Sequence, residues 1–195
     1  QLEKGTSPLI GREGERVLAD CLTLTDNPLR RHGPATAPFD GEGVPSRVNP
    51  LFARGVFSGF LHDLDSAAAC GCRSTGSARR DYDSPPAPGP ACLELAPGTT
   101  ALARAVADTR AGLLVLYCVG GGQSNILAGE VALNLTAALK IEGGELVGRV
   151  KDVMLADNIY RMLSTVDRVG DEPRDTGRDF LPWLSFPALK LAARD

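Results

Sequence analysis

The sequence predicts an α+β fold in which antiparallel β-sheet predominates and two or three short helices occur. Three observations predict it. Apolar segments are short and several alternate with polar residues, which is the pattern of half-buried strands. The chain has 22 glycines and 14 prolines among 195 residues, so much of it forms turns and loops. Only two or three segments space their apolar residues as a helix does. We expect a single domain over residues 1–195.

The first part of the chain predicts three strands. Residues 16–25 alternate apolar and polar side chains and end at the turn signal Asp26-Asn27-Pro28, which indicates a half-buried strand. Two apolar runs, Val48–Phe52 and Val56–Leu61, flank a short connection that contains Gly55. A glycine between two such runs is typical of a β-hairpin.

A helix and an exposed loop are expected next. The segment from Asp63 to Cys70 favours a helix that Asp63 caps at its start and Gly71 closes at its end. Residues 73–91 are polar and proline-rich, so we expect an exposed loop there.

The second part predicts more strands and two helices. Thr100–Arg110 is the strongest helical pattern, and Asp157-Asn158 caps a second, short helix. The apolar run Leu113–Val119 is consistent with a central strand. The remaining expected strands cover Leu93–Leu95, Glu130–Leu135, Ala137–Ile141, Leu146–Val153 and Ala188–Ala192, with a hairpin turn at residues 142–145.

Composition and charge exclude several classes of protein. The formal net charge of −3 gives no basic face for nucleic acid, and no apolar run is long enough to span a membrane. The N-terminus lacks the apolar core of a signal peptide and an initiator Met, which suggests an excised or processed chain. We interpret the five cysteines as reduced thiols and expect a cytoplasmic protein.

Metal-binding and catalytic patterns are missing. His32 and His62 are thirty residues apart, and Cys70 and Cys72 have no partner cluster at zinc-ligand spacing. We therefore predict no metal ligands, no cofactor and no catalytic residues in this chain. A hydrolase that uses one of these cysteines or histidines is an alternative that ranks below the two functions given at the end of this subsection.

Two short segments are candidates for peptide binding. Gly120, Gly121, Gly122 and Gln123 follow the apolar run, but neither the dinucleotide-binding pattern nor the P-loop occurs there. Consecutive glycines let another backbone approach closely, either a neighbouring strand or a peptide. Arg79 and Arg80 form a small cationic pair that is a second candidate.

The order of several motifs resembles the C-terminal domain of the TldD/PmbA family, also called modulators of DNA gyrase. The motifs are CLTLTDNP at residues 21–28, PFDGEGVPSR at 38–47, GVFSGFLHD at 55–63, STGSA at 74–78, GQSNILAGE at 122–130 and KIEGGE at 140–145. The resemblance covers roughly residues 15–192, and the family's N-terminal domain is absent.

The resemblance implies a zinc metallopeptidase system that acts on short or unfolded peptides. The resemblance implies that in catalytic TldD-type subunits the zinc is held by an HExxxH motif outside this region and by a cysteine shortly before the last strand. Here the corresponding residues 175–188 contain neither Cys nor His. The chain is therefore similar to the PmbA/TldE-type partner, which would pair with a TldD-type subunit or self-associate and shape the peptide cleft. The zinc would belong to the catalytic partner. The alternative is a stand-alone peptide-binding or scaffold module.

Overall fold

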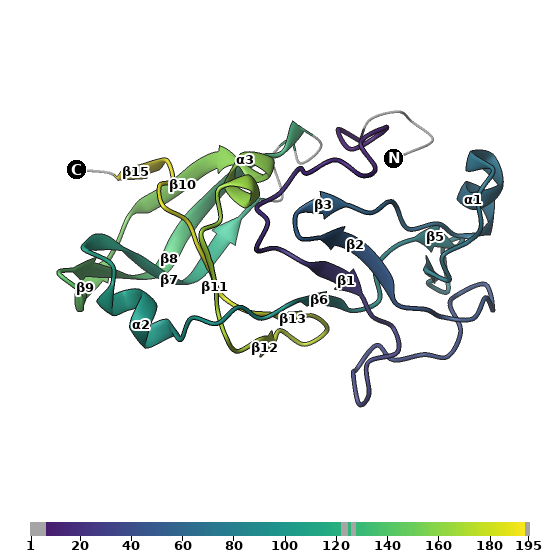
Figure 1. Ribbon diagram of the computed structural model, residues 1–195, viewed down its shortest axis with the longest axis horizontal. Coiled ribbons are helices and arrows are strands. Elements are labelled where there is room, and N and C mark those ends of the chain that lie inside the picture. The colour runs from purple at the N-terminus through teal and green to yellow at the C-terminus, as the bar shows by residue number, and fades with distance from the viewer. Residues whose placement is uncertain (1–6, 122–124, 126–127, 194–195) are drawn as a thin grey trace. The chain divides into compact units, whose positions relative to one another are not determined.

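The computed structural model describes residues 7–121, 125 and 128–193 (Figure 1). Contacts within the chain divide it into two compact units. Unit 1 comprises Gln1–Pro97 with Pro173–Pro182, and unit 2 comprises Gly98–Glu172 with Trp183–Asp195. We describe each unit by itself, and the interpretation of residues 1–195 as a single domain stays a prediction.

The α+β class is confirmed. Three short helices occur in the described residues, and most strand pairs are antiparallel. The exception among the named strands is the parallel pair of β13 (Phe180–Leu181) with β6 (Leu93–Leu95). Within the same described ranges, no helix is long and apolar enough to cross a membrane.

Unit 1 is built on a six-stranded sheet in the order β12-β13-β6-β1-β2-β3. Its remaining strands are β1 (Leu24–Asp26), β2 (Asn49–Ala53), β3 (Val56–Phe57) and β12 (Arg174–Asp175). The strand expected over residues 16–25 is therefore wrong for most of its length. The backbone N–H groups of Val17 and Leu18 donate to the carbonyl of Gly55 at 2.9 and 3.1 Å, so they bind a turn and do not form a ladder.

The expected hairpin is confirmed, with a shorter second strand. Phe52 pairs with Phe57 and Ala53 with Val56 across a turn whose central residues, Arg54 and Gly55, have φ of 49° and 75°. Two positive φ angles are typical of the type I′ hairpin turn. A Cβ on Gly55 would lie 2.3 Å from the carbonyl oxygen of Leu18, so this position requires glycine.

The first helix has the predicted caps. In α1 (Leu64–Cys70), Asp63 Oδ1 accepts from the backbone N–H of Ser66 at 2.8 Å, and Gly71 closes the helix with φ 64°. The loop that follows is largely as expected. It contains one small strand pair, formed by β4 (Ala78–Arg79) and β5 (Ala87–Pro88).

The core of unit 1 encloses one carboxylate. Asp26 is fully buried, and its Oδ1 accepts from the backbone N–H groups of Ala91 and Cys92 at 2.8 and 2.9 Å. These bonds tie the start of β6 to the end of β1, its neighbour in the sheet. The apolar side chains buried in the same unit include Leu18, Leu22, Phe57, Cys92 and Leu95.

Unit 2 is built on a second antiparallel sheet in the order β15-β10-β8-β7, with β9 also paired to β8. The strands are β7 (Ala111–Gly120), β8 (Glu130–Glu142), β9 (Glu145–Val150), β10 (Val153–Asn158) and β15 (Leu191–Ala193). The two strands expected between residues 130 and 141 are one continuous strand, β8. The expected central strand over Leu113–Val119 is wrong in position, because β7 lies at the edge of the described sheet.

Two helices and one small strand pair complete unit 2. The helix α2 (Leu102–Ala107) is shorter than expected, since Thr100 forms a parallel bridge with Gly170 and Ala101 offers no capping side chain. The helix α3 (Ile159–Ser164) begins as predicted at Asn158, whose Oδ1 accepts from the N–H groups of Tyr160 and Arg161. The small pair is β11 (Arg168–Val169) with β14 (Leu184–Ser185).

One face of the unit 2 sheet packs against α3. Met162 of this helix lies in a buried cluster with side chains of β8 and β10, namely Leu135, Ala138, Val153 and Leu155. This packing leaves the opposite face of β8 and β10 outside the core.

Candidate functional site

The edge strand β7 is the most distinctive surface of unit 2. It pairs along its length with β8, and no other described strand pairs with it. Figure 1 shows β7 beside β8, at the end of the sheet away from β15. An unpaired edge presents a row of backbone N–H and C=O groups that can bind another extended chain.

The second half of β7 is apolar and exposed. Leu116 is 58% exposed and Tyr117 64% exposed, and Val115 and Val119 on either side are exposed as well. Consecutive residues of a strand point to opposite faces, so both faces of this segment are uncovered. A long apolar edge of this kind promotes aggregation unless a partner covers it.

The charge pattern separates β7 from β9, which, like β15, is another outer strand of the described sheet. No residue of Ala111–Gly120 is charged, whereas β9 carries Glu145 and Arg149 in six residues. Charged side chains on an edge strand oppose the addition of another strand. The edge of β7 is thus the more suitable of the two to accept an extended peptide.

The glycines at the end of β7 contact β8. Gly120 and Gly121 have φ of 122° and 85°, and Gly121 N–H donates to the carbonyl oxygen of Ala132 at 3.1 Å. A Cβ on Gly120 would lie 2.7 Å from that same oxygen. The close approach between neighbouring strands, one of the two alternatives that the sequence left open, explains Gly120, whereas Gly121 is explained by its positive φ. Their role in peptide binding stays a prediction.

The other candidate residues lie outside the described part of unit 2 or belong to unit 1. Gly122 and Gln123 lie outside the described residues. Arg79 and Arg80 are exposed at β4 in unit 1, so they belong to a different unit from the glycines. In unit 1, Arg80 packs its Cβ near Gly41, whose N–H donates to the carbonyl of Ala78 at 2.8 Å. The arginine pair thus lies beside the 38–47 loop.

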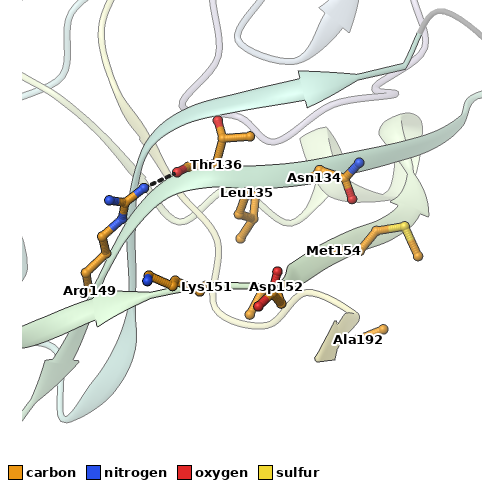
Figure 2. Close-up of a pocket in the computed structure, with 9 residues that line it drawn as sticks. Asn134, Leu135, Thr136, Arg149, Lys151, Asp152, Met154 and Ala192 are labelled. Atoms are coloured by element: carbon orange, nitrogen blue, oxygen red, sulfur yellow. Dashed lines mark hydrogen bonds between the residues drawn. The ribbon is translucent and has the colours of Figure 1, made fainter. Parts of the chain in front are cut away.

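A second feature of unit 2 was missed from the sequence. A pocket of about 660 Å³ opens where β9 ends and β10 begins, and Arg149, Lys151 and Asp152 lie at its polar side. Figure 2 shows Arg149 reaching back to the carbonyl of Thr136 on β8. We expected one strand over Leu146–Val153, whereas β9 ends at Val150 and β10 begins at Val153.

One buried ion pair stabilises the start of α3. The Asp157 carboxylate is 2% exposed and accepts hydrogen bonds from the Arg161 guanidinium and from the backbone N–H groups of Asn158 and Lys190. The bonds from Arg161 contribute most to holding the pKa of Asp157 far below its ordinary value, against the opposing effect of burial. This carboxylate is therefore a structural anion, which is unsuited to act as a general base.

The described residues contain no group of three or more His, Cys, Asp or Glu side chains that could hold a metal ion. The zinc that the family resemblance implies for catalytic subunits therefore has no fitting site in this part of the chain. Cys70, Cys72, Cys92 and Cys118 are free thiols, and burial raises the pKa of the Cys92 thiol.

Comparison with known proteins identifies relatives of the whole chain. The family model for the PmbA/TldA metallopeptidase C-terminal domain matches residues 1–193. A metalloprotease of Methanothermobacter thermautotrophicus is 30% identical over 173 residues, which cover 88% of this chain and 37% of the relative. The metalloprotease PmbA of Escherichia coli O157:H7 is 25% identical over 186 residues, covering 95% and 39%.

Two solved structures share the fold. TldE from Thermococcus kodakarensis superposes with a TM-score of 0.91 at 31% identity, covering 98% of this chain and 44% of that one. A protein of Thermotoga maritima described as a modulator of a DNA gyrase superposes with a TM-score of 0.89 at 26% identity, with the same coverage. The chain thus spans less than half the length of these relatives.

Proposed function

Because this chain belongs to the PmbA/TldD metallopeptidase family, of which it carries the C-terminal domain, we propose that it is the part of a non-metal-binding subunit that holds the peptide. In this proposal an extended peptide adds as a further strand to the free edge of β7. A TldD-type partner supplies the zinc and the catalytic groups. Main-chain hydrogen bonds provide most of the affinity, so short or unfolded peptides of varied sequence are accepted.

The observation that carries the proposal is the uncharged, apolar and unpaired edge of β7. Its exposed segment from Val115 to Val119 is five residues long, enough for several main-chain hydrogen bonds to a peptide. An enzyme that cleaves varied peptides benefits from recognising backbone groups, because every peptide has them.

Three observations support the non-catalytic role. Residues 175–188, where TldD-type subunits have a cysteine, contain neither Cys nor His. The described residues offer no metal-binding cluster. The similarity to TldE extends over 98% of the chain at 31% identity. We accordingly propose that the chain alone has no peptidase activity, and that it acts in the cytoplasm, where exposed reduced thiols such as Cys70, Cys72 and Cys118 persist.

A charge placed on the edge tests the proposal. Leu116→Lys puts a cation on the exposed part of β7 and should weaken binding of an unstructured peptide at least several-fold, as a charged edge opposes strand addition. Val147→Lys is the matched control, since Val147 is 51% exposed on β9 of the same sheet. Both substitutions replace exposed side chains, so stability should change little.

The titration separates the possible outcomes. Loss of binding in Leu116→Lys with wild-type binding in Val147→Lys supports the edge of β7. Equal binding by both variants and the wild type contradicts it. Adding a TldD-type partner then distinguishes the alternative function, because a stand-alone scaffold would bind peptide without any effect on cleavage by that partner.

A further inference from the structure

The pocket between β9 and β10 is a second candidate binding site in unit 2. Its volume of about 660 Å³ lies within the range of small-molecule sites in proteins. Its walls come from β8, β9, β10 and β15 and from the two residues that join β9 to β10. Figure 2 shows that β8 forms one side of it.

The pocket lies where the pairing of β8 with its neighbours is interrupted. On β7, Leu116 has no partner between the pairs Val115–Ala138 and Tyr117–Ala137. On β8, Thr136 has no partner in β7. It has none in β10 either, because the pairing of β10 with β8 ends at Val153–Leu135. The pairing of β9 with β8 ends at Ala138–Val150, so the connection at residues 151–152 leaves the sheet open.

Two cations lie at this opening. Arg149 donates from Nη2 to the carbonyl oxygen of Thr136 at 3.0 Å, which holds the guanidinium against β8. This bond uses one of the five N–H donors of the guanidinium. Neither Arg149 nor Lys151 forms an ion pair with any described carboxylate. Both side chains therefore remain available to an anionic ligand.

The connection itself is unusual in conformation. Asp152 has φ of 55°, a left-handed angle that aspartate and asparagine adopt more readily than most residues. Its carboxylate also lines the pocket, so the local charge is two cations against one anion. The pocket thus carries a net positive charge, which attracts an anionic ligand, although Asp152 itself repels a carboxylate.

The rest of the lining combines the polar residues Asn134 and Thr136 with four apolar residues, Leu135, Val153, Met154 and Ala192. Leu135 and Val153 are buried beneath the pocket, and the side chain of Met154 is partly exposed beside it. Figure 2 shows Met154 and Ala192 away from Arg149, so the cationic and apolar sides are separate. A methionine wall adapts to side chains of different shapes.

We infer that this pocket binds a small carboxylate that carries an apolar group, which is the chemistry of the C-terminal residue of a peptide. The carboxylate accepts from Arg149 and Lys151, and the apolar side chain contacts Met154. The inference rests on the proposed function in that a peptide, or a fragment released from one, is the physiological ligand. It does not depend on strand addition at β7, because β8 lies between that edge and the pocket.

Single-residue probes test the pocket separately from the strand edge, since they are too short to pair with β7. N-acetyl-leucine presents both the carboxylate and the apolar group, and N-acetyl-leucinamide lacks the charge. The α-amide of N-acetyl-glutamate presents only a side-chain carboxylate. Backbone amide NMR titrations of the 195-residue chain should show N-acetyl-leucine binding tightest, with shifts at residues 149–154. Equal binding of the acid and the amide, or tighter binding of the glutamate derivative, overturns the inference.

Variants that remove a cation or the anion from the pocket should change binding in opposite directions. Arg149→Gln and Lys151→Gln should each weaken N-acetyl-leucine binding by about twofold to tenfold, the range expected for exposed charge pairs and charge-assisted hydrogen bonds. Asp152→Asn should strengthen it, because it removes a like charge while asparagine still accepts positive φ. Arg110→Gln is the matched control, because it makes the same change in net charge at an exposed position outside the pocket.

The two cation variants also separate binding from folding. Arg149→Gln alters the bond to Thr136, whereas Lys151 makes no hydrogen bond or ion pair with the described residues, so Lys151→Gln should fold normally. Weaker binding in Lys151→Gln with stronger binding in Asp152→Asn supports the assignment. Unchanged binding in Lys151→Gln, or weaker binding in Asp152→Asn, contradicts it, and neither result bears on Leu116→Lys and the edge of β7.

Discussion

Gly120 approaches the carbonyl oxygen of Ala132 so closely that a Cβ at position 120 would lie 2.7 Å from it. The N–H of Gly121 donates to the same oxygen at 3.1 Å. This carbonyl of β8 thus explains the glycine at the end of β7, and the positive φ of Gly121 explains the next one. The proposal for peptide binding accordingly rests on the opposite edge of β7, where no described strand lies.

Gly121→Val should destabilise unit 2. A β-branched residue at φ of 85° is strained, and such strain costs about 1–3 kcal/mol. Urea unfolding should therefore show a lower midpoint. Gly148→Val on β9 is the control, since its Cβ would have no atom within 4 Å and its φ is not in the left-handed region.

The same variant tests the role of the glycines in binding. If peptide binding by the folded fraction of Gly121→Val equals that of the wild type, these glycines have no direct part in recognition. Abolished binding with an unchanged unfolding midpoint would instead assign them to the peptide site and contradict the structural explanation.

Asp26→Ala should destabilise unit 1 by about 3 kcal/mol or more. It removes two hydrogen bonds to a buried carboxylate and leaves the N–H groups of Ala91 and Cys92 without their acceptor. Asp20→Ala, at an exposed aspartate, should change stability far less. Similar unfolding midpoints for the two variants would show that Asp26 does not hold β6 against β1.

Asp157 should make the stability of unit 2 depend on pH in the acidic range. Its pKa is lowered in the folded state, so the folded protein binds this proton less readily than the unfolded chain does. The stabilising contribution is therefore fully present above the ordinary aspartate pKa of about 4, and it decreases as the pH falls below that value.

Asp157→Asn provides the comparison. The variant should be less stable at neutral pH and should lose part of the decrease in unfolding free energy between about pH 4 and pH 2. Unfolding curves with the same pH dependence in the variant and the wild type would show that the Asp157–Arg161 pair does not contribute to acid sensitivity.

The purified chain should bind no stoichiometric zinc, because its cysteines and histidines are not clustered at ligand spacing. Elemental analysis after dialysis measures this directly. About one zinc per chain, lost in a Cys70→Ser and Cys72→Ser double variant, would contradict the prediction and reopen a metal role for the end of α1.

Local signals predicted the parts of the fold that depend on local chemistry. Asp63 and Gly71 bound α1, Asn158 begins α3, and Arg54-Gly55 and Gly143-Gly144 form hairpin turns, each because a cap or a positive φ selects particular residues. The family resemblance was confirmed because the order of several short motifs is specific even where each motif is weak.

Features that depend on pairing were harder to predict. The run Leu113–Val119 is apolar enough for a central strand, and nothing within it shows that only β8 pairs with it. The pocket at Lys151-Asp152 was missed for the same reason, since a strand break is visible only when the neighbouring strands are aligned. In the stretch from 16 to 23, alternation suggested a strand, yet the backbone binds the Gly55 turn.

Hydrogen exchange of the β7 backbone tests the central claim most directly. Strand addition forms main-chain hydrogen bonds, so an unstructured peptide at saturating concentration should slow exchange of amides between Val115 and Val119. Amides of β9 should exchange as before, and a higher peptide concentration should be needed to protect β7 in Leu116→Lys than in the wild type. Binding of the peptide without protection in β7, or with protection confined to β9, would contradict the account.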